Sequence, residues 1–304
     1  MSTIIGASLG SFKGLTIEQS LDLYLKLSRY YSLNAVEIRF EKEEGRPSMW
    51  YWEDYGISNF LKDFVIKGAH LPFIHLNPVS PNPGIREESM SQLKMSITKA
   101  AELDMDYAVM HASGLAQNLN RAQELAEWAK VMEELTGHAR ENGIVLTLEN
   151  ADSLWDLKDM ATIVRQIDSN YLKITLDVGH AYIRRIPPLS AYPIKELALR
   201  ALDVAGMPFI IKEGMPYERY GSIRQFLESE YDLIFCLHIH DYNGRRDHLN
   251  IGSGKADFSF LSILNKRGFT GPLILETEFK SDPAISVEDI FELNYKHLQD
   301  LLNN

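Results

Sequence analysis

Eight short runs, rich in β-branched and other apolar residues, recur along this chain and are separated by longer stretches with helical periodicity. We expect strands at Thr3–Ser8, Ala35–Phe40, Ile66–His70, Tyr107–His111, Val145–Glu149, Lys173–Asp177, Ile234–His238 and Leu273–Glu276. The intervening stretches predict helices after a capping box at Thr16 and over Arg86–Leu103, Leu119–Glu141, Leu157–Ile167, Phe258–Arg267 and Val287–Leu302. Alternation of this kind with eight strands is what a closed parallel barrel requires, so the pattern predicts an α/β fold, a single (β/α)₈ barrel.

The length of the chain agrees with one barrel. Its 304 residues fit a single domain over residues 1–304, because barrels often reach this size as one unit. One connection is too long for an ordinary link between a strand and the next helix, the insertion at about residues 183–230 between the sixth and seventh strands. Since it follows a strand, we expect it to extend over the C-terminal face of the barrel.

Composition narrows the class of protein. Hydrophobic residues make up 45% and charged residues 24%, which is ordinary for a globular protein with a large core. The N-terminus has no signal-peptide pattern, no apolar stretch approaches the roughly 18 residues of a membrane span, and Cys236 is the single cysteine, so we expect a cytoplasmic protein with a buried thiol. The formal net charge of −11 disfavours a broad nucleic-acid surface.

The predicted strand ends carry the chemistry. From the third strand onward, six consecutive strands end on a side chain that can bind a metal ion: His70, His111, Glu149, Asp177, His238 and Glu276. About one residue in six of the chain is Asp, Glu or His, so six such ends in a row arise by chance on the order of once in 10⁴–10⁵, before a tenfold discount for freedom in placing the ends.

A parallel barrel brings these ends together, because its strand C-termini converge on one face. Carboxylates buried together need a cation, and Glu149, Asp177, His238 and Glu276 offer three oxygens and one nitrogen from four adjacent strands. That mixed set suits Zn²⁺, Mn²⁺, Co²⁺ or Mg²⁺, with one ion expected and up to three conceivable. The alternative is a solvated acidic mouth whose charges pair with Lys and Arg.

Other features near the strand ends have weaker signals. His180 and His248 are expected at the same mouth, and His240 in a supporting or surface position. The turn Gly252-Ser253-Gly254 has backbone N–H groups that can hold an anion, although a simple tight turn is at least as good an interpretation. The aromatic cluster Met49–Trp52 either stacks on a sugar ring or an unpaired base or, more often in such proteins, caps the barrel mouth or packs against the next helix.

Seven motifs together resemble the xylose isomerase-like barrel superfamily, along nearly the whole chain. They are AHLPFIHLN, VMHASG, LTLENAD, LDVGHAY, HIHDYNG, DHLNIGSG and PLILETE. Similarity to its ketose epimerases implies one metal ion held by Glu149, Asp177, His238 and Glu276. It also implies that Glu149 and Glu276 act as an acid/base pair through an enediolate, with His180 contacting the substrate.

Similarity to endonuclease IV, in the same superfamily, implies instead a trinuclear zinc phosphoesterase acting on abasic DNA. There His70, His111 and Glu149 hold one zinc, and His180 and His248 share another with an Asp two residues before the second histidine. That place is Arg246 here, and Asp247 is shifted by one.

The sequence therefore favours a metal-dependent isomerase or epimerase of a sugar or sugar phosphate, with His180, His248, Arg246 and Glu37 as residues for substrate or additional metal. Glu37 in NAVEIRF is typical of the sugar-converting branch, and Arg246 and the insertion depart from the endonuclease pattern. The phosphoesterase is the alternative, and a metal-containing barrel without activity is the third hypothesis.

Overall fold

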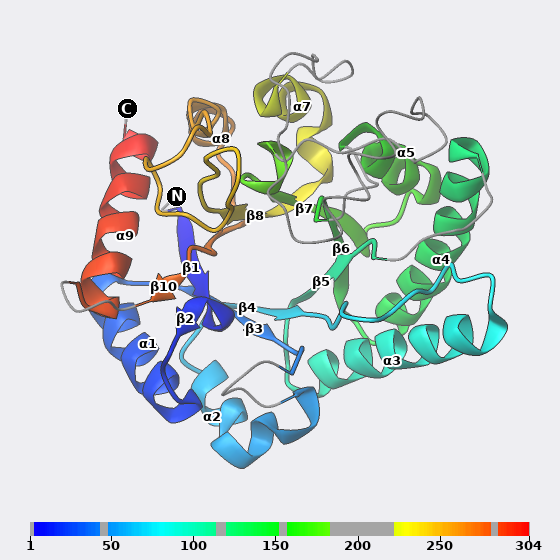
Figure 1. Ribbon diagram of the computed structural model, residues 1–304, viewed down its shortest axis with the longest axis horizontal. Helices are drawn as coiled ribbons and strands as arrows, with labels where there is room; N and C mark the ends of the chain where they lie inside the picture. Colours follow the sequence, from blue (N-terminus) through cyan, green and yellow to red (C-terminus); the bar gives the residue numbers. More distant parts are fainter. Residues whose placement is uncertain are drawn as a thin grey trace, which may run out of the picture.

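Eight parallel strands form a closed barrel in the computed structural model, which describes residues 3–42, 48–113, 120–151, 157–182, 222–280 and 285–303 (Figure 1). Around the barrel the order is β1, β3, β4, β5, β6, β7, β8 and β9, with β9 paired to β1. These strands span Ile4–Ser8, Ala35–Arg39, Ile66–His70, Tyr107–His111, Val145–Glu149, Leu172–Asp177, Ile234–Ile239 and Pro272–Leu275. The predicted (β/α)₈ barrel is confirmed.

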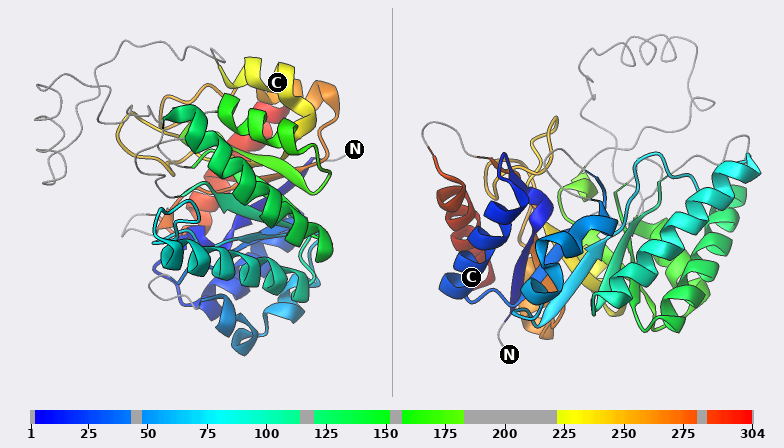
Figure 2. Two further views of the ribbon diagram at one scale, coloured as in Figure 1. Left: turned by 90° about the vertical axis from the view of Figure 1, so that its right-hand side faces the viewer. Right: turned by 90° about the horizontal axis from the view of Figure 1, so that it is seen from below.

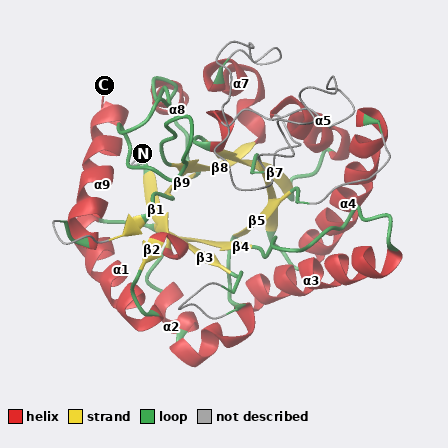
Figure 3. Ribbon diagram, in the orientation of Figure 1, coloured by secondary structure: helices red, strands yellow, loops and turns green. Residues whose placement is uncertain are grey.

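Helices surround the strands on the outside, as the ring of red around yellow in Figure 3 shows. They are α1 (Ile17–Tyr31), α2 (Ile57–Leu61), α3 (Pro83–Glu102), α4 (Arg121–Glu141), α5 (Leu157–Ile167), α7 (Ile223–Glu230), α8 (Leu261–Arg267) and α9 (Val287–Asn303). Short 3₁₀ turns η1 (Leu9–Ser11), η2 (Met49–Tyr55), η3 (His180–Tyr182) and η5 (Tyr231–Leu233) and a small parallel pair, β2 (Phe12–Lys13) with β10 (Phe279–Lys280), complete the described structure. In the side views of Figure 2, the yellow-orange loop after β8 rises at one end of the barrel.

Most predicted boundaries agree with the structure to within three residues. The capping box at Thr16 is present, since its hydroxyl accepts from Gln19 N–H and the Gln19 side chain accepts from Thr16 N–H. The helix predicted over Phe258–Arg267 begins three residues later, at Leu261, and Asp257 accepts from Ser259 N–H before it. Of the predicted insertion, residues 183–221 lie outside the described part of the chain, and most of the remainder forms α7.

The core has two layers that follow from strand alternation. Inside the barrel a small cluster consists of Ala35, Tyr107, Val109, Cys236 and Ile274, and a much larger one fills the space between strands and helices. Cys236 is buried, as predicted. None of the described helices combines the length and apolarity needed to cross a bilayer.

Helix α1 is bonded directly to the barrel wall. The Tyr24 hydroxyl accepts from Ala7 N–H at 2.7 Å and donates to Ala35 O at 2.7 Å, so it bridges β1 and β3. The strands can approach so closely beside this bridge because residue 6 is glycine: a Cβ there would lie 2.3 Å from Ala35 O. The close approach pairs Gly6 with Ala35, the first residue of β3, and so sets the register of the two strands.

We predict that Gly6→Ala lowers the free energy of unfolding by about 1–3 kcal/mol, because the new methyl group must displace the β3 backbone. Gly137→Ala is the matched control, since a Cβ at this position of α4 would meet no other atom within 4 Å. The control should leave stability unchanged or raise it by up to about 1 kcal/mol. Chemical denaturation measures both variants, and equal effects would contradict this account of the β1–β3 contact.

Candidate active site and metal centre

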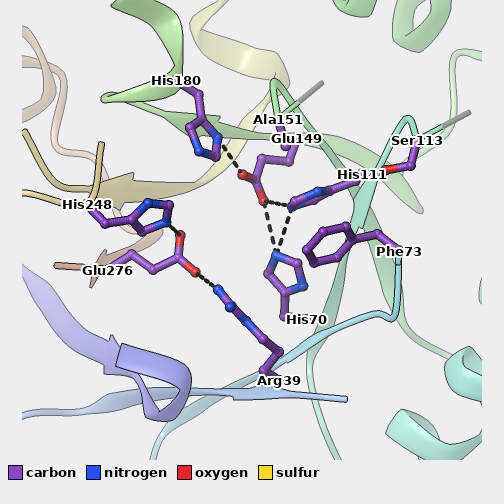
Figure 4. Close-up of a pocket in the computed structure, with 10 residues that line it drawn as sticks. All are labelled: Arg39, His70, Phe73, His111, Ser113, Glu149, Ala151, His180, His248 and Glu276. Carbon is purple, nitrogen blue, oxygen red and sulfur yellow. Dashed lines mark hydrogen bonds and ion pairs between the residues drawn. The ribbon is translucent and has the colours of Figure 1, made fainter. Parts of the chain in front are cut away.

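A cavity of about 430 Å³ opens at the carboxyl ends of the strands (Figure 4). Such a volume is within the range of small-molecule sites. Its walls combine two carboxylates, four imidazoles, a guanidinium and an aromatic ring, from Glu149, Glu276, His70, His111, His180, His248, Arg39 and Phe73, with Ser113 and Ala151 beside them. Six of the ten residues that the sequence singled out therefore line one cavity.

Four buried side chains converge at the base of this cavity. Glu149, Asp177, His238 and Glu276 each offer a ligand atom, and these atoms lie within 4.8 Å of one another. His238 Nδ1 is 3.0 Å from Glu276 Oε2, 3.4 Å from Glu149 Oε2 and 3.8 Å from Asp177 Oδ2. These are the four metal ligands that the sequence predicted from adjacent strands, although β8 continues to Ile239 and β9 ends at Leu275, one residue before Glu276.

The hydrogen bonding of the cluster fits a bound cation. Both carboxylate oxygens of Glu149 and the Nδ1 atom of His238 are buried and make no hydrogen bond within the described part of the chain. Buried polar atoms are normally satisfied, and three carboxylates close together need positive charge. Oxygen and imidazole donors of this kind match Mn²⁺, Co²⁺, Zn²⁺ or Mg²⁺, so the residues present fit a divalent metal ion.

The electrostatics of the cluster keep its carboxylates ionised. Burial by itself raises the pKa of Glu149, but His111 and His238 outweigh it and hold this pKa well below its ordinary value. The same balance applies to Glu276, where His238 and Arg39 overcome burial and lower the pKa. Burial lowers the pKa of His238, yet Glu37, Glu276 and Glu149 raise it well above its ordinary value. The surrounding carboxylates therefore favour a proton on His238 when no metal ion is bound.

A second group of ligand atoms lies beside Glu149. His70 and His111 both direct Nε2 toward it: the two nitrogens are 3.0 Å apart and lie 3.5 Å and 3.3 Å from Glu149 Oε2. His70 Nδ1 faces the carbonyl of Leu71 at 3.2 Å, which leaves Nε2 for the cavity. Phe73 stacks on His111 with ring centroids 4.1 Å apart, and so covers one wall.

A third group forms the opposite side of the cavity. His180 Nδ1 is 3.2 Å from Glu149 Oε1, and its Nε2 is 3.5 Å from Asp247 Oδ2. Asp247 Oδ1 also lies 3.3 Å from His248 Nδ1. Arg246 does not line the cavity; its exposed side chain lies 3.6 Å from Glu278. The loop therefore brings Asp247 to the two histidines, although the sequence spacing had placed Arg246 there.

Asp177 is held from three sides. His240 Nε2 is 2.9 Å from both of its carboxylate oxygens, and the Asn150 amide exchanges two hydrogen bonds with its backbone. His180 N–H donates to Asp177 Oδ1 at 2.6 Å. The His240 ring occupies space that only glycine leaves open, because a Cβ at Gly179 would lie 2.0 Å from it. His240 is thus a buried supporting residue, and not a surface residue.

Two side chains from β3, one behind the cavity wall and one lining it, also contact the predicted ligands. Glu37 was predicted to contact substrate or an extra metal ion, but it does not line the cavity and its Oε2 lies 3.0 Å from His238 Nε2. Arg39 does line the cavity and donates from Nη2 to Glu276 Oε1 at 2.9 Å. The sequence reasoning missed Arg39 because it extended that strand to Phe40; the strand's last residue was the available signal.

The glycine turn does not form an anion site. Asp241 accepts from Gly252 N–H and Gly254 N–H through Oδ2 and from Ala256 N–H through Oδ1, at 2.8–3.0 Å. A carboxylate of the chain itself therefore occupies the position that a phosphate would need. The tight-turn interpretation of Gly252–Gly254 is the one that the structure supports.

The three aromatic residues of the cluster, Trp50, Tyr51 and Trp52, do not line the cavity. Trp52 is fully buried and donates from Nε1 to Arg39 O at 3.3 Å, whereas Trp50 and Tyr51 are more than half exposed. Trp50 lines a separate groove on the outer wall together with residues of α3, among them Met95. For Trp52, the interpretation as a packing residue is the one that the structure supports.

Comparison with known proteins places the chain in a family. The sequence model described as xylose isomerase-like TIM barrel matches residues 26–301. The chain belongs to this family. Among curated relatives, the uncharacterized protein MJ1311 of Methanocaldococcus jannaschii is 27% identical over 233 residues, which are 74% of this chain and 68% of the relative.

Solved structures share the fold of this xylose isomerase-like barrel. A D-tagatose 3-epimerase-like protein superposes with a TM-score of 0.70 at 22% identity, over 99% of this chain and 97% of the other. D-Allulose 3-epimerase from Methylomonas sp., in complex with D-allulose, gives a TM-score of 0.69 at 14% identity, over 99% and 96%.

We predict that metal binding releases protons and weakens as pH falls. The metal ion requires an unprotonated His238 Nδ1, and the neighbouring carboxylates raise the pKa of His238 in the metal-free protein, so the ion competes with a proton for this atom. Affinity should therefore rise between about pH 6 and 8, by about tenfold per pH unit for each proton released. Titration calorimetry with Mn²⁺ in buffers of different ionisation enthalpy measures the release; a heat that is independent of buffer and an affinity that is independent of pH would contradict it.

Proposed function

We propose that this protein is a metal-dependent sugar isomerase or epimerase in which Glu149 and Glu276 transfer the protons. One observation carries the proposal. Of the four clustered ligands, only these two glutamates line the cavity. They stand at the ends of the two outermost of four adjacent strands, since Glu149 ends β6 and Glu276 directly follows β9. Asp177 and His238, from the two strands between, are buried and do not line the cavity.

This arrangement suits proton transfer at a carbon next to a carbonyl group. One carboxylate removes the proton from one face of that carbon and the electrons of the C–H bond form an enediolate, and the other glutamate, when protonated, returns a proton from the opposite face. Both carboxylates are surrounded by groups that control their protonation: Arg39 and His248 beside Glu276, and His180, His111 and His70 beside Glu149.

The remaining walls would bind and orient a small polar substrate. Phe73 offers an apolar face, and its position is fixed because Glu41 accepts hydrogen bonds from Phe73 N–H and Ile74 N–H at 2.7 Å and 3.2 Å. His180 and His248 lie on the opposite side, where sugar hydroxyl groups need donors and acceptors.

The metal ion would be held by Glu149, Asp177, His238 and Glu276. When bound, such an ion acts as a Lewis acid that polarises a carbonyl group and makes the neighbouring C–H bond more acidic. Structural similarity to a D-tagatose 3-epimerase-like protein and to D-allulose 3-epimerase supports ketoses as the substrates to test first.

Glu276→Gln and Glu149→Gln should each lower the rate of epimerisation by about 10²–10⁴, because an amide cannot exchange a proton at these positions. The assay follows D-tagatose, D-allulose and D-fructose in D₂O with Mn²⁺ or Co²⁺ by proton NMR, and detects both interconversion and deuterium incorporation. Metal content is measured on each variant, so that loss of the ion is distinguished from loss of proton transfer.

Glu278→Gln is the matched control. Glu278 lies two residues from Glu276, but its side chain is partly exposed and pairs with Arg246 outside the cavity. It should keep full activity. Full activity in Glu276→Gln or Glu149→Gln would eliminate the two-glutamate mechanism.

Zinc-dependent phosphodiester hydrolysis remains the second candidate, because two further ligand groups exist. His70, His111 and Glu149 form one, and the loop that turns Arg246 outward brings Asp247 between His180 and His248. A zinc-loaded sample incubated with a duplex that contains an abasic site distinguishes the candidates. The epimerase proposal predicts intact DNA, and nicking that requires His70 and His111 would favour hydrolysis.

A further inference from the structure

Glu37 is a buried carboxylate that lies outside the cavity. It is the third residue of β3, and its side chain has no solvent exposure. Its Oε2 atom lies 3.0 Å from His238 Nε2 and 3.0 Å from the Tyr107 hydroxyl oxygen. The predicted metal ligand His238 therefore contacts Glu37 through one ring nitrogen and the other three ligands through the opposite one.

The donors and acceptors in this network have a fixed direction. The Tyr107 hydroxyl donates to Glu37 Oε2, and the same carboxylate oxygen accepts from His238 Nε2–H. The Tyr107 oxygen can then accept from the Cys236 thiol, whose sulfur is 3.7 Å away. In the neutral imidazole, a proton on Nε2 leaves the lone pair on Nδ1. That atom faces Glu149, Asp177 and Glu276.

The barrel is built to allow this contact. Glu37, Gly68 and Tyr107 are neighbours in register on β3, β4 and β5. A Cβ at Gly68 would lie 2.3 Å from Tyr107 Cζ and 2.5 Å from its hydroxyl oxygen. Because Gly68 on the middle strand has no side chain, the Tyr107 ring can lie across it and place its hydroxyl within hydrogen-bond distance of Glu37.

We propose that Glu37 is a positioning residue that holds the proton of His238 on Nε2 and so presents Nδ1 to the metal ion. Carboxylates behind a histidine ligand fix the orientation of the ring and increase its basicity, and their loss typically costs 10–100-fold in metal affinity. This role differs from the substrate contact that the sequence indicated, and it rests on the metal site of the proposed function.

The experiment compares Mn²⁺ and Zn²⁺ dissociation constants of the wild type, Glu37→Gln and Asp159→Asn by titration calorimetry. Asp159 is the matched control, because it is also a buried carboxylate but pairs with Arg121 on the outer side of the barrel. Glu37→Gln should weaken metal binding by about 10–100-fold, and Asp159→Asn should leave it within twofold of the wild type.

A second measurement needs no variant and so does not depend on the folding of Glu37→Gln. Nitrogen-15 NMR of the zinc-loaded wild type should show His238 bound to zinc through Nδ1 with a proton on Nε2. Zinc on Nε2, or an affinity of folded Glu37→Gln within twofold of the wild type, would overturn the role of Glu37.

These outcomes separate the inference from the proposed function. A wild type that binds no metal ion would refute both. Weaker metal binding in Glu37→Gln, in a protein that epimerises no sugar, would support the role of Glu37 and contradict the proposed reaction.

Discussion

The structure at the mouth of the barrel depends on three carboxylates, from Glu149, Asp177 and Glu276, that are brought together away from water around one imidazole. Burying like charges in this way is costly unless positive charge compensates them. In the protein without a metal ion, the compensation comes from His238, His180 and Arg39, whose side chains lie within 4 Å of these carboxylates. A bound divalent ion would supply part of this positive charge from one position that all four ligands contact.

A set of side chains that do not line the cavity contacts the four ligands and the loop beside them, and so determines the geometry of the site. Glu37 holds His238, His240 and Asn150 hold Asp177, and Asp241 holds the loop that carries Asp247 and His248. Glycines at positions 68 and 179 leave room for Tyr107 and His240, where any side chain would collide. The four ligands are therefore supported by the barrel itself, and sites built on strands are positioned more precisely than sites built on loops.

Much of this arrangement was predictable from the sequence. Strand periodicity placed eight strands to within about two residues, and the convergence of parallel strand ends then brought Glu149, Asp177, His238 and Glu276 together without further information. What the sequence did not show was the direction of individual side chains. Arg246 and Asp247 are neighbours in one loop, and only the loop's hydrogen bonds decide that Asp247 faces the histidines.

The sequence also did not show which residues far apart in the chain contact each other. Glu37 and His238 are separated by 201 residues, and their pairing depends on which side of each strand faces the barrel interior. In the glycine turn a contact within the chain excludes a function that the sequence pattern allowed. The pattern was compatible with anion binding, but the carboxylate of Asp241, eleven residues before Gly252, already accepts the hydrogen bond that an external anion would need. Local motifs predicted the type of chemistry, and long-range contacts decided which atoms were available for it.

The most direct measurement of the central claim is a crystal structure of the protein grown with Mn²⁺, with the ion located by its anomalous scattering. We expect one well-occupied ion within about 2.0–2.4 Å of oxygens of Glu149, Asp177 and Glu276 and of His238 Nδ1. An ion bound elsewhere in the cavity, with these four side chains still in contact with one another, would contradict it.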